Sequence, residues 1–320
     1  MDVIDLEEEK KKPGRPRKKN ASNSIPHDGI VSDASDPRLW LDAVYDNPTM
    51  FKKIFTTFKN FDVEKIYVKF DPNGIKMYSP DSINKNNIYC TIDGQRMNRY
   101  YCKTTIDIIF SICTIKRILT ELTKECSSIT FTMTESMINN KITVITNEAR
   151  INVNSYSTLE VLQNNEYKWE EIEEKIARIK DYPVSFELPA KFFKTKIVNL
   201  RLCADITTIE KNGNGNLRFT TPYKDEHGEN ITRFESPEKI GLKEDIQDDN
   251  IFAVSLYLEH IKTVATTAIT NEINIYADKD KDVVFLFYLD QDEQYNEKKI
   301  LKSEKARIYI LTPIIRNSLT

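Results

Sequence analysis

The chain has 320 residues, enough for two domains with separate cores, and its 40% apolar and 30% charged residues are typical of a folded globular protein. The sequence has neither the ~20 consecutive apolar residues of a membrane-spanning helix nor the apolar segment of a secretory signal, so we expect no membrane association. The net charge of −3 argues against a uniformly basic surface, but it permits a concentration of positive charge on one face. Five scattered cysteines without a Cys-x-x-Cys pair favour reduced thiols and an intracellular location.

Residues 1–38 are predicted to form a disordered tail, because they are polar, contain four prolines and lack apolar periodicity. Within the tail, residues 10–19 read KKKPGRPRKK, with seven Lys or Arg and no acid. The Gly-Arg-Pro sequence at 14–16 resembles an AT-hook, in which an extended Arg-Pro segment enters the narrow minor groove of A·T-rich DNA. A nuclear localisation signal or a generic basic arm would have the same composition. The tail residues predicted to bind DNA are Arg15, Arg17, Lys18 and Lys19.

Residues 39–155 are predicted to form the first of two domains. A helix is predicted at 50–61, where phenylalanine and isoleucine recur with helical spacing, and a second helix is predicted at 107–122. A Pro-Asn-Gly turn at 72–74 separates two apolar runs, as in a β-hairpin. The strands predicted for this domain are 66–70, 75–79, 128–134, 141–146 and 149–155.

Residues 156–181 are predicted to be an interdomain connector that is partly helical. Between residues 165 and 180, Trp169, Ile172, Ile176 and Ile179 form one apolar stripe, while glutamates occupy the other side. Acidic residues in the first turns and basic residues at the end suit the dipole of a helix.

Residues 182–320 are predicted to form a second domain that repeats the first. Helices are predicted at 189–200 and 255–269, and the latter shares an Ile-Lys-x-Ile/Val sequence with the helix at 107–122. The strands predicted for this domain are 205–210, 217–221, 272–278, 282–289 and 306–313. Because helix, strand, Asn-Gly turn and strand recur in the same order, we predict an α+β fold with two copies of one unit and antiparallel sheets.

Residues suited to catalysis or metal binding are sparse. The three histidines, His27, His227 and His260, have no ligand spacing to one another or to a cysteine pair. The sequence contains neither a phosphate-binding loop nor a nucleophile elbow, and NGNG at 212–215 is interpreted as a hairpin turn. We therefore predict that the protein is not an enzyme and has no metal or cofactor.

Basic residues on the predicted helices avoid the apolar stripes and gather on the opposite side. One explanation is that any exposed helix face carries lysine. The alternative, which repetition on four helices favours, is that these faces line one surface that contacts DNA phosphates without reading bases. The residues predicted for this surface are Lys52, Lys53, Lys59, Lys116, Arg117, Lys191, Lys194 and Lys262.

Three features in this order resemble PCNA, the eukaryotic-type sliding clamp. They are GIKMYSPDS at 74–82, the repeated second helix, and YILTPI at 309–314, and the resemblance spans residues 39–315. The Pro-Gly-Arg-Pro tail, YDNP at 45–48 and the long connector resemble in particular the PCNA-like proteins of African swine fever virus and related large DNA viruses.

The resemblance implies a DNA-clamp fold, in which two repeated domains place antiparallel sheets outside and helices around the hole of a ring, usually a homotrimer. Such a ring encircles double-stranded DNA without sequence preference and acts as a processivity factor that tethers a DNA polymerase and other replication and repair proteins. Clients of such clamps dock between the connector and the C-terminal strand. The corresponding residues here are Trp169, Ile172, Tyr309, Leu311, Pro313 and Ile314.

Two other functions fit the same features. The protein could be a clamp-fold viral transcription factor, or an AT-hook DNA-binding adaptor whose folded body binds other proteins. All three functions are compatible with a host cytoplasmic viral factory or the nucleus.

Overall fold

The computed structural model describes residues 37–316 with short gaps. The gaps are residues 47, 62, 82, 84, 138–140, 152, 165–166, 212–216, 225–227, 234–239, 243–251, 268 and 297–298, and for 240–242 and 290–305 only the backbone is described. The predicted DNA-binding residues of the tail and the predicted turn at 212–215 therefore lie outside the described residues.

The first half of the chain consists mainly of strands. Its elements are β1 (Leu39–Tyr45), α1 (Pro48–Asn60), β2 (Lys65–Asp71), β3 (Gly74–Pro80), β4 (Asn87–Asp93), η1 (Gly94–Arg96), β5 (Arg99–Cys102), β6 (Ile106–Ser111), α2 (Ile112–Glu121), β7 (Ser128–Thr134), η2 (Glu135–Met137), β8 (Lys141–Glu148) and β9 (Val153–Glu160). The segment that follows contains β10 (Leu162–Gln163), α3 (Trp169–Ala177) and η3 (Arg178–Asp181).

The second half repeats the pattern of strands with two helices. Its elements are β11 (Val184–Pro189), α4 (Ala190–Leu200), β12 (Ile206–Lys211), β13 (Arg218–Pro222), β14 (Glu229–Arg233), β15 (Ile240–Leu242), β16 (Phe252–Tyr257), α6 (Leu258–Thr266), β17 (Glu272–Ala277), β18 (Val283–Asn296) and β19 (Lys299–Thr312). In each half a strand leads into the first helix and another strand leads into the second helix.

One ten-stranded antiparallel sheet runs through the middle of the molecule, in the order β10-β6-β2-β3-β4-β19-β18-β17-β11-β15. A five-stranded sheet, β5-β1-β7-β8-β9, lies at one end, and a four-stranded sheet, β14-β13-β12-β16, lies at the other. The two halves share the central sheet because β4 pairs with β19, from Ile92 opposite Ala306 to Asn87 opposite Leu311. The halves are therefore joined by a continuous hydrogen-bonded ladder.

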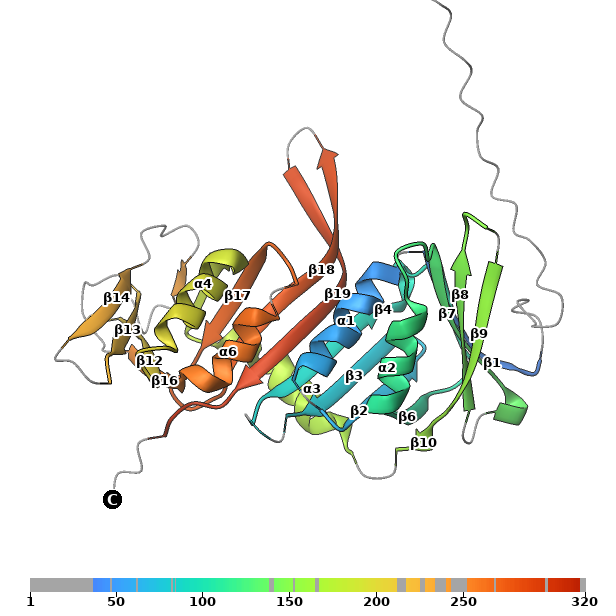
Figure 1. The fold of residues 1–320 in the computed structure, drawn as a ribbon, viewed down its shortest axis with the longest axis horizontal. Helices are drawn as coiled ribbons and strands as arrows, with labels where there is room; N and C mark the ends of the chain where they lie inside the picture. The colour runs from blue at the N-terminus through green and yellow to red at the C-terminus, as the bar shows by residue number, and fades with distance from the viewer. Residues whose placement is uncertain are drawn as a thin grey trace, which may run out of the picture.

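Helices cover the two faces of the central sheet unequally. Figure 1 shows α1, α2, α4 and α6 on one face and α3 behind the sheet on the other. Strand alternation explains this arrangement, because successive side chains point to opposite faces. On β2, for example, Ile66 and Val68 belong to the core under the four helices, whereas Tyr67 belongs to a second cluster under α3.

The helix α1 lies where helical spacing predicts it, and its buried side chains include Phe51, Ile54, Phe55 and Phe58. The two helices predicted at 107–122 and 255–269 are shorter than expected, which corrects the prediction at both positions. In each case the first residues form a strand, β6 or β16, and the helix begins only at Ile112 or Leu258. A continuous apolar run does not distinguish a buried strand from a buried helix.

The change from β6 to α2 occurs at Ser111. Its hydroxyl accepts a hydrogen bond from the backbone N–H of Thr114 at 3.1 Å and so caps the first turn of the helix. Before this cap, Ile106, Ile108 and Phe110 are buried in the central sheet, where branched and aromatic residues pack well. A further difference is that residues 149–151, predicted as strand, form a turn before β9.

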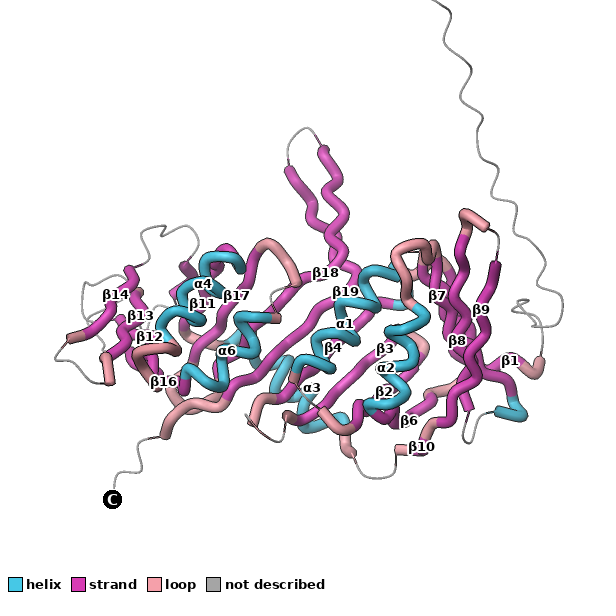
Figure 2. The backbone as a smooth tube through the Cα atoms, in the orientation of Figure 1, coloured by secondary structure: helices cyan, strands magenta, loops and turns pink. Residues whose placement is uncertain are grey.

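The strands β18 and β19 continue beyond the central sheet as a two-stranded ribbon, visible in Figure 2. Their pairing extends from Val283 opposite Thr312 to Asn296 opposite Lys299. No helix in the described part of the chain is long and apolar enough to cross a membrane.

Candidate nucleic-acid surface and docking cavity

The four helices on one face of the sheet carry an excess of positive charge. Within their bounds they contain nine Lys or Arg residues and two acids, Glu121 and Glu259. Seven of the eight predicted contacts have exposed side chains: Lys53, Lys59, Lys116, Arg117, Lys191, Lys194 and Lys262. Because the apolar side of each helix packs on the sheet, these basic side chains lie on the opposite, solvent-facing side. Such a surface attracts phosphates without reading sequence.

Lys52, the eighth predicted residue, has a different environment. Its ammonium donates a hydrogen bond to the carbonyl of Leu122 at 2.8 Å, and its side chain is half-buried. Leu122 is the C-cap residue of α2, where carbonyl groups lack helical partners and a cation is favoured by the helix dipole. Lys52 thus fastens α1 to the end of α2, a contact that helical spacing alone does not predict.

An ion pair joins the other two helices. Arg201, at the end of α4, pairs with Glu259, in the first turn of α6. The end of one helix therefore lies beside the start of the other, as in an antiparallel pair. The pair also neutralises one of the two acids on this layer of helices.

The opposite face of the sheet presents a row of tyrosines. Tyr67, Tyr78, Tyr89 and Tyr309 lie side by side in register on β2, β3, β4 and β19. Trp169 and Ile172 of α3 pack on this row, as the predicted apolar stripe requires. Burial raises the pKa of Tyr78 to about 12 and also raises the pKa of Tyr89, so both remain neutral phenols.

The start of α3 is held by Asp107 on β6. The carboxylate accepts hydrogen bonds from Trp169 Nε1 at 2.7 Å and from Asn164 Nδ2 at 2.9 Å. Burial raises the pKa of Asp107, although these two hydrogen bonds act in the opposite direction. Tyr167 adds a stacked contact on Tyr78, with ring centroids 4.2 Å apart. The sequence pattern did not identify Asp107 or Tyr167, because neither belongs to a periodic stripe.

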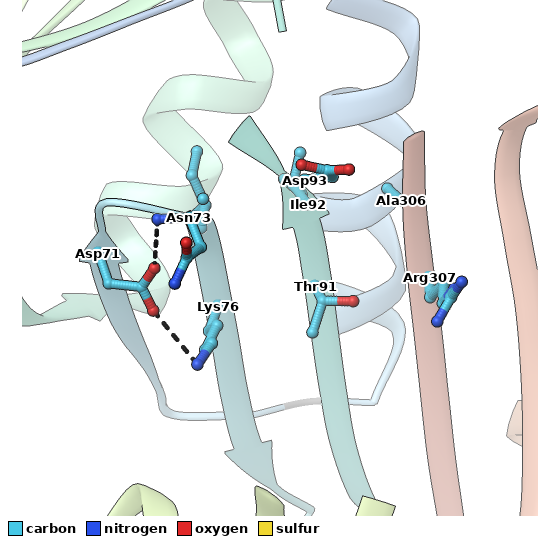
Figure 3. Close-up of a pocket in the computed structure, with 10 residues that line it drawn as sticks. Asp71, Asn73, Lys76, Thr91, Ile92, Asp93, Ala306 and Arg307 are labelled. Carbon is cyan, nitrogen blue, oxygen red and sulfur yellow. Dashed lines mark hydrogen bonds and ion pairs between the residues drawn. The ribbon is translucent and has the colours of Figure 1, made fainter. Parts of the chain in front are cut away.

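Lys76 on β3 links the sheet to the side of α3. Its ammonium lies 3.2 Å from Asp71 and donates a hydrogen bond to Glu173 at 2.9 Å. Burial by itself would lower the pKa of Lys76, but the bond to Glu173 and the charge of Asp71 raise it. Figure 3 shows the cavity beside this pair, which measures about 310 Å³ and is also lined by Thr91, Asp93 and Arg307. The cavity is polar and contains both signs of charge.

The predicted docking residues are divided between two places. Trp169, Ile172, Tyr309 and Leu311 meet in the cluster under α3, where all four are buried. Pro313 and Ile314 follow β19 and are half-buried, and Ile314 packs against the core under the four helices. The groove expected beside the connector is therefore filled by the connector's own helix.

A second cavity remains open at the C-terminal end of α3. It measures about 340 Å³ and is called the connector cavity below. Its lining residues are Glu171, Glu174, Lys175, Arg178, Tyr182, Asp280, Lys281, Asp282, Leu311 and Arg316. Of the six predicted docking residues only Leu311 lines it. The turn between β17 and β18, which supplies three of the lining residues, was not identified from the sequence.

Comparison with known proteins supports the sequence resemblance. Residues 40–167 match the family described as Proliferating cell nuclear antigen, N-terminal domain. Uncharacterized proteins of African swine fever virus, from a pig isolate from Kenya and a warthog isolate from Namibia, are each 24% identical over 283 residues, covering 87% of this chain and 93% of theirs. The crystal structure of PCNA from Entamoeba histolytica matches with a TM-score of 0.62 and 12% identity, over 87% of this chain and all of the other.

These matches define the class of protein: the chain has the PCNA clamp fold, with antiparallel sheets and a few helices. The chain is accordingly similar to PCNA-type clamps in its fold and N-terminal half, and similar to the African swine fever virus proteins over most of its length. Known proteins with the PCNA-like clamp fold form a family of non-enzymatic scaffolds. In the described residues no group of His, Cys, Asp or Glu side chains is arranged to hold a metal ion.

Proposed function

We propose that the protein is a sliding clamp that encircles duplex DNA and holds a DNA polymerase and other partners on it, without catalysis of its own. The one-sided distribution of charge supports this proposal most directly. The four helices on one face carry nine basic and two acidic residues, whereas α3 on the other face carries four glutamates and one lysine. A ring with the helices inside would present its positive side to the phosphates.

The two ends of the molecule are suited to closing such a ring. Among the described strands, β9 is an edge of the five-stranded sheet and β14 is an edge of the four-stranded sheet at the opposite end. Exposed apolar side chains lie at both ends: Ile151, Val153 and Tyr156 near β9, and Leu202 and Ile231 near β14. An unpaired edge with apolar side chains is a surface for another chain. Contact of unlike ends is head-to-tail and forms a ring when the rotation closes, here in a homotrimer.

In the proposed mechanism, the protein stays on DNA because the ring is closed, not because its affinity for DNA is high. Individual phosphate contacts are weak, with non-specific dissociation constants on the order of 10⁻⁴–10⁻⁶ M, and so permit sliding. Ring closure prevents escape, and a tethered polymerase gains effective concentration at the primer end. In this scheme residues 39–155 and 182–320 are the clamp domains, 156–181 is the connector, and the basic tail adds a second DNA contact inside an infected cell.

A comparison of helix and tail variants tests the proposal. One variant carries Lys53→Ala, Lys116→Ala, Lys191→Ala and Lys262→Ala, and the other carries Arg15→Ala and Arg17→Ala. We expect the helix variant to weaken binding to a 30-base-pair duplex more than the tail variant, measured by fluorescence anisotropy at several salt concentrations. If the tail variant alone abolishes binding, the AT-hook adaptor or transcription-factor function replaces the clamp.

A further inference from the structure

The two outer helices of the helix layer lie at the two ends that the proposed ring would join. Figure 1 shows the order α4, α6, α1 and α2 along the molecule, so α4 and α2 are the end members. At one end α2 is tied to the edge strand β9, because Ser157 Oγ donates a hydrogen bond to the Glu121 carboxylate at 3.4 Å. At the other end α4 packs on β13, the neighbour of β14, with the ring centroids of Phe193 and Phe219 6.5 Å apart. Head-to-tail contact would therefore bring α2 of one copy beside α4 of the next, at a place called the seam below.

Both seam helices are basic. The helix α2 carries Lys116 and Arg117 with one acid, and α4 carries three lysines with no acid. Lys116, Arg117, Lys191 and Lys194 have exposed side chains, and within the described residues none of these four forms an ion pair. Like charges placed opposite one another oppose association, most strongly at low salt. The seam therefore closes against the repulsion of its own helices.

The rest of the contact between unlike ends does not share this repulsion. The edge strands carry both signs of charge, with Glu160 on β9 and with Glu229 and Arg233 on β14. On α4, Phe192 is 44% exposed, and Leu202, just after the helix, is 85% exposed. Burial of these apolar side chains would favour contact between copies. Two opposing effects thus meet at the seam, and anions between α2 and α4 would shift the balance toward closure.

We propose that the seam is a phosphate site that exists only in the assembled ring, and that duplex DNA inside the ring stabilises the contact between copies. Lys116 and Arg117 of one copy and Lys191 and Lys194 of the next would bind phosphates of the DNA backbone. These phosphates would neutralise the cations and so remove the repulsion that opposes closure. Because the two equilibria are linked, DNA strengthens the ring, and the closed ring binds DNA more tightly than the separate chains do. The inference rests on the proposed clamp function and makes ring closure depend on the DNA.

Exchange of subunits between rings measures the strength of closure. Two batches of the full-length protein, one labelled with a donor fluorophore and one with an acceptor, are mixed, and energy transfer appears as copies exchange. Saturating 30-base-pair duplex should slow exchange of the unmodified protein about fivefold or more, the low end of typical coupling between two binding events. Exchange that is equally fast with and without the duplex would overturn the proposal.

Charge reversal on either seam helix should remove the repulsion without DNA. Lys116→Glu with Arg117→Glu places acids opposite Lys191 and Lys194. This variant should slow exchange in the absence of DNA roughly tenfold, the order expected when two exposed repulsions become ion pairs. The duplex should then slow exchange no further. Lys191→Glu with Lys194→Glu should behave in the same way, so the test stands if one of the two variants does not fold.

A combined variant and a matched control locate the effect. Combining the two reversals should restore fast exchange, because acids then face acids, and such non-additivity identifies α2 and α4 as neighbours across the seam. The control, Lys168→Glu with Lys180→Glu, reverses two exposed charges of the connector. It should alter exchange less than about twofold, since exposed charges away from the contact contribute little. Equal slowing by the control, or slow exchange in the combined variant, would contradict the proposal.

The solution mass of the unmodified protein separates this proposal from the clamp function itself. A ring-sized mass and duplex binding, together with exchange rates that are insensitive to charge reversal on α2 and α4, would show that only the phosphate site at the seam is wrong. A monomer at every concentration would overturn the proposed clamp, and the seam with it.

Discussion

Lys52 and Lys53 are neighbours in the sequence, and the structure gives them different roles. Lys52 donates to the Leu122 carbonyl, whereas Lys53 is exposed on the proposed DNA side. Lys52→Gln should lower the free energy of unfolding by about 1 kcal/mol, the usual value of one hydrogen bond, and leave the salt dependence of DNA binding unchanged. Lys53→Gln should preserve stability and reduce the slope of log K against log salt by about 0.9. Urea denaturation and salt titration separate the roles, and identical behaviour of the two variants would contradict them.

His260 on α6 makes stability depend on pH. Burial lowers its pKa, the charge of Lys85 lowers it further, and Asp81 and Glu259 oppose the shift. Since the unfolded chain binds the proton more tightly, stability should fall as pH decreases through 6.5 toward the lowered pKa. His260→Asn should therefore lose less stability than the unmodified protein between pH 7 and 5.5, as measured by urea denaturation. Parallel pH curves for both proteins would show that His260 does not contribute.

At the scale of elements, α3 is held mainly at its first turn. Trp169→Phe keeps an aromatic ring on the tyrosine row but removes the hydrogen bond to Asp107. The variant should lose about 2 kcal/mol, because a hydrogen bond to a charged group is lost and Asp107 stays half-buried. Hydrogen exchange should accelerate from Tyr167 to Asp181, with Glu170→Gln as an exposed control. Exchange that accelerates equally throughout the protein would contradict a local role for Trp169.

Sequence reasoning located most elements but misplaced some boundaries. Helical spacing identified α1 and the buried stripe of α3, and the Asn-Gly turn identified the hairpin of β2 and β3. The starts of α2 and α6 were wrong because branched and aromatic residues in an apolar run suit either a strand or a helix. Tertiary packing decided between them.

The candidate sites were predicted to different extents for physical reasons. Exposure of a helical lysine follows from periodicity, and seven of the eight basic residues predicted for the helix surface are exposed as expected. The contact of Lys52 with α2 depends on how two helices pack, which no single stripe encodes. The connector cavity combines α3, the turn between β17 and β18, Leu311 of β19 and Arg316, which are far apart in the sequence.

At the scale of the whole molecule, the account depends on contact between unlike ends. Tyr156→Arg at one end and Ile231→Glu at the other should each convert the assembly to monomers without unfolding, because both side chains are exposed in the single chain. Ile83→Glu is the control, since Ile83 is 66% exposed in the loop between β3 and β4, away from both edges. Sedimentation velocity measures assembly and circular dichroism measures folding. An assembly that persists in both end variants would exclude β9 and β14 as the interface.

The most direct test of the ring is its mass in solution. Light scattering coupled to size exclusion would be performed over a wide concentration range, on the full chain and on residues 39–320, which lack the tail. The account predicts three times the mass of the single chain in both cases, where the full chain has a mass of 37.3 kDa. A monomer at every concentration would contradict retention by ring closure, while the clamp fold of the single chain would stand.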